Sequence, residues 1–178
     1  MARPRLTGVL LVGGASTRFG SPKALARLNG ETLAERAWRL LGETCGERLA
    51  VGKRADALDL PFELVDDGTE TRAPLAGLVA GLRAAPTELA VVIPVDVPLL
   101  TRDLLLELAD ACAEAGVPQT GPLPGAYRRT ALPVLQSRLD QGRLALHDAL
   151  GELDVRRVEV DAALLANVNT QDELRRLG

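Results

Sequence analysis

The stretch "LLVGGASTRFGSPKAL", residues 10 to 25, contains the transition that decides the fold. It begins inside an apolar run, Leu6 to Val12, which is typical of a buried strand. Gly13 and Gly14 follow at the point where the strand gives way to a turn. Glycine permits positive φ and a close approach of the backbone, so consecutive amides in "GGAST" suit an anion-binding concavity. The stretch therefore predicts a strand followed by a loop that binds an anion.

Two basic residues, Arg18 and Lys23, come soon after the glycines and would place positive charge around the same anion. The pattern is not a Walker A loop, because Lys23 follows "GSP" instead of standing between a glycine and Ser or Thr, and it does not satisfy G-x-G-x-x-G. The alternative is a glycine turn with two solvated basic side chains. The position directly after the first strand favours phosphate binding.

Length and charge limit the classes of function. The 178 residues fit one domain, 1–178, with no internal repeat or dividing linker. The 21 Lys and Arg residues against 24 Asp and Glu give a net charge of −3, with no basic block. Nucleic acid is not expected as a partner, because its binding depends on clustered basic groups, and 2% aromatic residues offer few surfaces for base stacking.

Cysteine usage and hydropathy indicate a cytoplasmic protein. Cys45 and Cys112 stand far apart with His147 as the single imidazole, so no zinc pattern can be assembled. The opening apolar run is at the bottom of the usual length range for a signal peptide, and it continues into a glycine-arginine loop instead of a small-residue cleavage site. No run approaches the roughly 18 apolar residues of a membrane helix. We expect a reducing compartment and no membrane partner.

Short apolar runs alternate with segments of helical period, which is the signature of a layered α/β domain. Thr32 with Glu35, and Thr170 with Glu173, have the spacing of helix capping boxes, and a helix is also expected after Thr101. Helical patterns recur near 130–140 and 143–150, beyond a Gly/Pro-rich stretch. The strand candidates are "LTGVLLV", "RLAVG", "FELV" and "ELAVVIPVD".

Three polar segments should meet at one edge of the sheet, because ligands of parallel sheets lie beyond the carboxyl ends of the strands. These segments are the loop after Val12, the acidic pair after Val65 and the aspartate after Val95. Asp96 would project at the end of its strand, where an oxygen ligand can hold a hard cation, although such a residue is often only a turn former or helix cap.

The acidic pair Asp66 and Asp67 has two readings. Either carboxylate could contact a base or ribose, and loop acids are also commonly solvated. His147 has no carboxylate or serine partner suggested by spacing, so a position on a helix surface or half-buried is expected.

With these residues in view, the sequence resembles the molybdenum cofactor guanylyltransferases, within the wider nucleotidyltransferase group. That group begins with a strand and a pattern close to L-A-G-G-x-S-x-R-M-G-x-x-K. The segments "APLAGL", "VDVPLL", "PLPGAYRRTALPVL" and "NVNTQDEL" resemble further family motifs in the same order. "LVGGASTRFGSPK" matches the first pattern at Leu11, Gly13, Gly14, Ser16, Arg18, Gly20 and Lys23.

The resemblance implies a doubly wound, mostly parallel, Rossmann-like sheet in three layers. It also implies an Mg²⁺-dependent transfer of GMP from GTP to the terminal phosphate of the molybdenum-molybdopterin cofactor, with release of pyrophosphate. Arg18, Lys23 and Asp96 would be catalytic, Asp96 would also bind the metal, and Asn167 and Asn169 would lie on the acceptor side. The nucleotide-binding residues carried over from the family are Leu11, Val12, Gly13, Gly14, Lys23, Asp67 and Asp96.

Partners follow from the same resemblance. Transient contact is expected with proteins that deliver or receive the cofactor, in a monomer or small homo-oligomer. Three positions depart from the family pattern: Val12 for alanine, Phe19 for methionine, and Ala73 for a glycine.

Alternatives stay open for the nucleotide base that the protein uses and for whether it is a catalyst. "SPK" also occurs in cytidylyltransferase relatives, whereas Gly13-Gly14 and "NVNT" favour guanine. A cytidylyltransferase for the same cofactor, another small nucleotidyltransferase, and a non-catalytic nucleotide-binding or carrier protein stay open.

Overall fold

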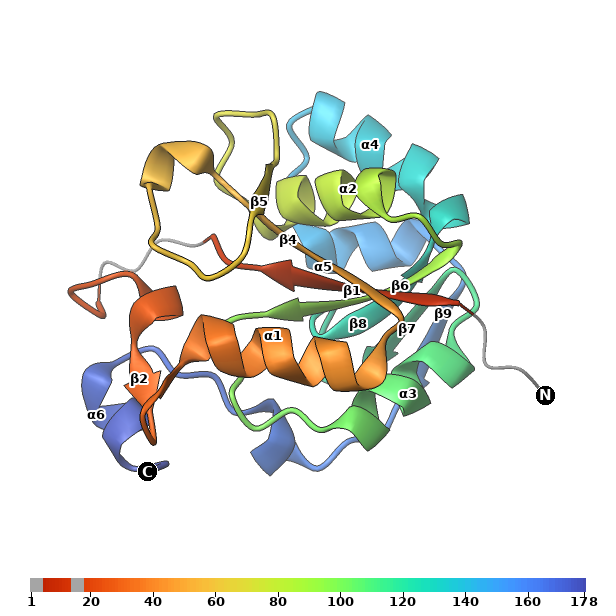
Figure 1. Ribbon diagram of the computed structural model, residues 1–178. Helices are drawn as coiled ribbons and strands as arrows, with labels where there is room; N and C mark the ends of the chain where they lie inside the picture. The colour runs from red at the N-terminus through yellow and green to blue at the C-terminus, as the bar shows by residue number, and fades with distance from the viewer. Residues whose placement is uncertain (1–4, 14–17) are drawn as a thin grey trace.

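A computed structural model describes residues 5–13 and 18–178. In this part of the chain seven strands form one mostly parallel sheet (Figure 1). β8 runs antiparallel to both of its neighbours, while the other neighbouring pairs are parallel. Across the sheet the strands are β5 (Leu64–Asp66), β4 (Glu47–Gly52), β1 (Leu6–Leu11), β6 (Leu89–Pro94), β8 (Gly125–Arg128), β7 (Ala115–Pro118) and β9 (Val155–Val158).

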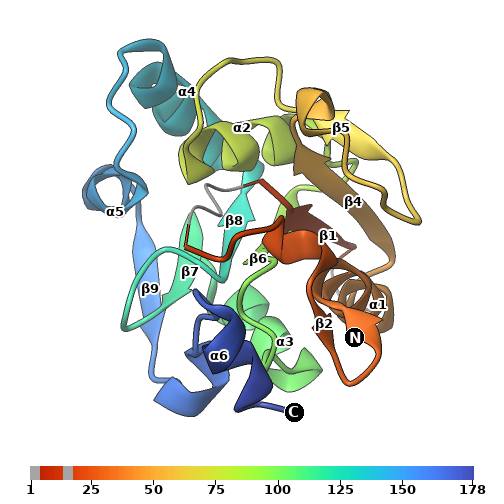
Figure 2. The ribbon, with the colours of Figure 1, turned by 90° about the vertical axis from the view of Figure 1, so that its left-hand side faces the viewer.

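Helices cover both faces of the sheet, so the expected three layers are confirmed. Figures 1 and 2 show α1 (Leu33–Thr44) and α3 (Arg102–Ala111) on one face. The other face carries α2 (Pro74–Ala84), α4 (Leu132–Asp140) and α5 (Leu146–Ala149). The sheet is therefore doubly wound, as the resemblance implies.

Alternation along β1 divides the apolar core between these two faces. Leu10 packs in the cluster with Leu41 of α1, whereas Val9 packs in the cluster with Leu78 of α2. Every residue of β1 is buried, which fits a central strand with helices on both sides. The inward faces of α2 and α3 are apolar, and the residues on them or at their ends that are buried are Leu75, Leu78, Val79, Leu82, Leu105, Leu108 and Cys112.

Both predicted capping boxes are confirmed. At α1, Thr32 Oγ1 accepts the N–H of Glu35 at 3.1 Å, and the Glu35 carboxylate accepts the N–H of Thr32 at 2.8 Å. The same reciprocal pair joins Thr170 and Glu173 at the start of α6 (Gln171–Arg175). Thr101 caps α3 through the N–H of Leu104.

The Gly/Pro-rich stretch differs most from its sequence pattern, because it contributes β7 and β8. These short strands are buried except for Arg128 at the end of β8, so they lack the polar alternation that marks a half-exposed strand. The helical pattern over 143–150 corresponds to the short α5 alone, which is followed by a 3₁₀ turn. The remaining strands are β9 and a separate hairpin of β2 (Arg27–Leu28) and β3 (Glu31–Thr32). The 3₁₀ turns are η1 (Lys23–Leu25), η2 (Arg54–Asp56), η3 (Arg129–Ala131), η4 (Leu150–Glu152) and η5 (Ala162–Leu165).

The chain order creates a switch point beside β1. From β1 the chain moves outward through β4 to β5, and then returns through α2 to β6 on the other side of β1. The carboxyl ends of these parallel strands share one edge, where α/β sheets bind their ligands. No helix of residues 5–13 and 18–178 is long and apolar enough to cross a membrane.

Candidate active site

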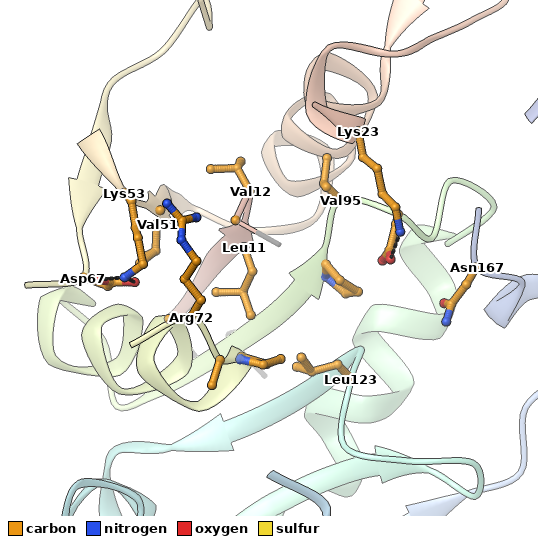
Figure 3. A pocket seen from close by; sticks show the side chains of 17 residues that line it. Leu11, Val12, Lys23, Val51, Lys53, Asp67, Arg72, Val95, Leu123 and Asn167 are labelled. Atoms are coloured by element: carbon orange, nitrogen blue, oxygen red, sulfur yellow. Dashed lines mark hydrogen bonds and ion pairs between the residues drawn. The ribbon is translucent and has the colours of Figure 1, made fainter. Parts of the chain in front are cut away.

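A cavity of about 440 Å³ lies at the carboxyl edge of the sheet (Figure 3). Gly13, Asp67 and Asp96 all line it, so the predicted convergence of the three segments is confirmed. Of the residues carried over from the family, those in the lining are Leu11, Val12, Gly13, Lys23, Asp67, Asp96 and Asn167.

At one end of the cavity, Lys23 joins two residues that are distant in sequence. Its ammonium donates to Asp96 Oδ2 at 3.3 Å and to Asn169 Oδ1 at 3.1 Å. The side chains of Lys23 and Asp96 are 17% and 25% exposed, so the pair is accessible from the cavity yet partly shielded from water. Three residues assigned by resemblance therefore form one hydrogen-bonded cluster.

Main-chain hydrogen bonds fix the Asp96 side of this cluster. Asp96 lies two residues beyond β6, and the N–H of Val95 continues the sheet pairing to the carbonyl of Leu11 at 3.2 Å. The Asp96 carbonyl accepts the N–H of Val168 at 2.8 Å, and the Val168 side chain is 1% exposed. The buried valine anchors the segment 167–169 beside the end of β6.

The first turn of α6 positions Asn169. Glu173 is the third residue of this helix and the partner of Thr170 in the capping box, and its carboxylate also accepts the N–H of Asn169 at 2.6 Å. The capping box at the chain's last helix therefore holds an asparagine against Lys23, and Asn167 lines the cavity two residues earlier.

Lys53 and Asp67 form the opposite end of the cavity (Figure 3). β4 and β5 are parallel with Gly52 opposite Asp66, so the next residue of each strand emerges at the same level. Lys53 Nζ donates to Asp67 Oδ1 at 2.8 Å and to Oδ2 at 2.9 Å.

Sequence reasoning missed two cationic residues of the lining, Lys53 and Arg72. A signal for Lys53 existed, because it follows the predicted strand "RLAVG" at the edge where ligands bind. Arg72 lies in the loop before α2, where its guanidinium pairs with Asp56 at 2.7 Å and lowers the pKa of that carboxyl group.

The side chains of Asp66 and Asp67 lie in different environments. Asp66 is exposed and accepts the N–H groups of Arg54 and Gly68, both at 2.8 Å, and these hydrogen bonds lower its pKa. It holds the loop backbone and is not part of the lining in the described residues, whereas Asp67 is.

Apolar residues form the wall between the two charged ends. Leu11 and Val12 lie there in Figure 3, and the lining also includes Val51 and Gly77. Gly52 permits a close approach, because a Cβ at this position would lie 2.7 Å from Val12 Cγ2. The cavity thus combines an apolar wall with charged ends, a combination suited to a ring system that carries phosphate groups.

Some assigned residues lie elsewhere. Gly14 and Ser16 are outside the described residues. Arg18 is exposed and, within residues 5–13 and 18–178, is not among those that line the cavity. His147 is exposed on α5, in agreement with the surface reading.

The described lining carries three cations, Lys23, Lys53 and Arg72, against the carboxylates of Asp67 and Asp96. This balance suits an anionic ligand. Over residues 5–13 and 18–178 no group of three or more His, Cys, Asp or Glu side chains could hold a metal by itself. Mg²⁺ commonly takes one or two carboxylates and completes its octahedron with water and substrate phosphates, so the oxygen of Asp96 fits a cation that arrives with a phosphate ligand.

The family to which the sequence is similar agrees with this geometry. Residues 8–157 match the family described as "MobA-like NTP transferase domain". The chain belongs to this family. It is therefore a nucleotidyltransferase, and the cavity lies within the matched segment except for Asn167.

Curated relatives of this MobA-like chain match over nearly their whole length. A probable molybdenum cofactor guanylyltransferase of Chloroflexus aggregans is 37% identical, covering 96% of this chain and 92% of the relative. One from Bacillus subtilis, with the same name, is 33% identical over 93% and 90% of the two chains. Among solved structures, molybdopterin-guanine dinucleotide biosynthesis protein A of Archaeoglobus fulgidus has a TM-score of 0.81 at 24% identity, covering 96% of each chain, which shows the shared fold.

Proposed function

We propose that this protein transfers GMP from GTP to the terminal phosphate of the molybdenum-molybdopterin cofactor and releases pyrophosphate. The observation that carries the proposal is the Lys23, Asp96 and Asn169 cluster at one end of a cavity that has an apolar wall and carries Asp67 at its other end. The names of the curated relatives support the choice of GTP and of the cofactor as the two substrates.

In this proposal the nucleotide spans the cavity. The base lies against the apolar wall near Leu11, Val12 and Asp67, and the triphosphate reaches the loop after Gly13 and the ammonium of Lys23. The amides of Gly13 and Gly14 and the guanidinium of Arg18 would surround the same phosphates. Positive groups aimed at the phosphates offset the negative charge that otherwise opposes attack by a second anion.

The reaction needs alignment more than proton transfer. An oxygen of the cofactor's terminal phosphate attacks the α-phosphorus, a new P–O bond forms, and the bond from the α-phosphorus to the bridging oxygen of the β-phosphate breaks. Pyrophosphate leaves with the electron pair of that bond. Holding the two reactants in line removes much of the entropic barrier, and this is the main task of the cavity.

Asp96 is the residue that we propose to bind Mg²⁺, together with substrate phosphates. Such a cation neutralises phosphate charge and polarises the phosphorus centre when it is bound. Lys23 keeps a positive group beside Asp96, and Asn169 orients that ammonium through its amide oxygen.

The acceptor is proposed to approach from the side of segment 167–169. Asn167 lines the cavity near Lys23 in Figure 3, and Asn169 contacts Lys23 directly. Amide side chains donate hydrogen bonds to phosphate oxygens without adding charge. We further propose that residues 1–178 act as one nucleotidyltransferase domain, because the first strand, β1, and the last, β9, belong to one seven-stranded sheet.

Isotope-labelled GTP tests the proposal directly. With purified cofactor, label at the α-phosphorus should enter a dinucleotide product, while label at the γ-phosphorus should appear in pyrophosphate. A non-catalytic nucleotide-binding protein would retain GTP and produce neither. Label from the γ-position in the cofactor would indicate phosphoryl transfer and would contradict the proposal.

A further inference from the structure

The ion pair of Lys53 and Asp67 is shielded more strongly than the other charged pair of the cavity. The Lys53 and Asp67 side chains are 11% and 8% exposed. Both residues line the cavity, at the end opposite Lys23 (Figure 3). Removing charges from water is costly, so a pair placed here has to be held by well-formed hydrogen bonds.

The ammonium of Lys53 is directed at its neighbours within the protein. It donates to Asp67 Oδ1, to Asp67 Oδ2 and to the carbonyl oxygen of Thr69. These hydrogen bonds hold the ammonium against the carboxylate of Asp67, so Lys53 supports that carboxylate in a fixed position.

The carboxylate of Asp67 keeps room for one more donor. A carboxylate offers about four acceptor positions. Among the described residues, Oδ1 accepts from Lys53 and from the N–H of Thr69 at 3.2 Å, while Oδ2 accepts from Lys53 alone. One position on Oδ2 is left, on a side chain that lines the cavity.

We propose that Lys53 is a positioning residue for base recognition: it fixes Asp67 so that the open position on Oδ2 accepts a hydrogen bond from the 2-amino group of guanine. This inference rests on the proposed function, which places the base at this end of the cavity. A carboxylate accepts and does not donate, so it selects a ligand with an N–H group at that point. Because the lysine charge balances the carboxylate, the neutral base enters without facing a lone charge.

Binding of GTP and ITP, measured by calorimetry, tests the inference, because inosine lacks only the 2-amino group. A hydrogen bond to a charged acceptor predicts that the parent protein prefers GTP over ITP by about tenfold or more. In Lys53→Met the ratio should fall to near one, and Lys53→Arg, which can still pair with the carboxylate, should retain it. Arg54→Met, which removes an exposed neighbouring cation outside the lining, is the matched control and should retain it too.

A second variant separates recognition from folding. Lys53→Met leaves a buried carboxylate without its cation, which is destabilising. Lys53→Met with Asp67→Leu removes both charges, so this protein should unfold at a temperature near that of the parent and still bind GTP and ITP alike. A loss of GTP preference in a folded double variant supports the inference, because a merely structural role of the pair would leave the ratio unchanged.

Two results would overturn the inference. One is a GTP to ITP ratio in Lys53→Met equal to that of the parent. The other is a parent protein that binds GTP more tightly than dGTP but binds GTP and ITP equally, together with a Lys53→Met variant that binds GTP and dGTP equally. This result would assign the hydrogen bond of Asp67 to the ribose instead of the base. Failure of GMP transfer by the parent is a separate result, because it contradicts the proposed function. The ratio of the GTP and ITP affinities would still test the positioning role of Lys53.

Discussion

The ammonium of Lys23 lies 3.3 Å from the carboxylate of Asp96, although 73 positions separate the two residues in the chain. One residue comes from the loop after β1 and the other from the end of β6, two strands that are neighbours in the sheet. Asn169 completes the cluster from the far end of the sequence. The fold thus brings a cation and a carboxylate that the proposed reaction uses together at the switch point of the sheet.

Replacing Asp96 by alanine should abolish Mg²⁺-dependent transfer, with a loss of at least about a hundredfold, because the proposed metal ligand is removed. The fold should persist, since Val168 bonds to the Asp96 carbonyl, which alanine also has. Pyrophosphate release and circular dichroism would be measured on the same preparation. Unchanged Mg²⁺-dependent activity in a folded variant would refute the metal role.

Lys23→Ala should weaken the binding of GTP by about tenfold or more, because a hydrogen bond between charged groups is lost at the phosphate end of the cavity. Calorimetry gives the dissociation constant. Arg27→Met is a suitable control, since Arg27 is an exposed cation four residues further on and is not part of the lining. Equal affinity of Lys23→Ala and the parent would count against phosphate contact.

The capping box of α1 should make stability depend on pH. Glu35 accepts the N–H of Thr32, and this hydrogen bond lowers its pKa below the ordinary value of 4.5. A depressed pKa in the folded state contributes stability that is fully present above pH 4.5 and is lost as pH falls through the folded value. The unfolding temperatures of the parent and Glu35→Ala should therefore differ most between about pH 5.5 and pH 7. This range begins roughly one pH unit above the ordinary pKa, so the carboxyl group is ionised in the folded and the unfolded protein. A difference that persists undiminished at pH 3 would rule out this origin.

Gly116 of β7 should not tolerate a side chain. A Cβ there would lie 2.3 Å from the Leu108 carbonyl oxygen of α3, so the helix would have to shift away from the strand. Gly116→Ala is expected to lower the free energy of unfolding by about 3 kcal/mol, at the upper end for overpacking. Gly121→Ala is the control, because a Cβ at that position has no neighbour within 4 Å among the described residues. Urea unfolding of the two variants would decide, and equal stability would contradict the packing argument.

The sequence was informative wherever a local pattern has one physical cause. The apolar run before Gly13 predicted β1, and the spacing of Thr32 and Glu35 predicted the start of α1, because both signals depend on neighbours in the chain. The meeting of Gly13, Asp67 and Asp96 was also predictable, since parallel strands bring their carboxyl ends to one edge.

Pairings between strands or side chains that are distant in the chain were harder to predict from the sequence. β7 and β8 are short, buried and rich in glycine and proline, so their sequence carries turn signals while their strand character comes from pairing within the sheet. The partnership of Lys53 with Asp67 depends on the register of β4 against β5, which no local spacing reveals. Asp67 could be separated from Asp66 only after the structure placed one in the cavity and the other on the loop backbone.

The most direct test of the central claim is the rate of pyrophosphate release with purified molybdenum cofactor and Mg²⁺, with GTP and CTP offered in parallel. Guanylyl transfer to the cofactor predicts rapid release with GTP, little with CTP, and none when the cofactor is omitted. A preference for CTP would leave the fold and the site in place and contradict the guanine assignment. No release with either nucleotide would contradict the proposed transfer itself.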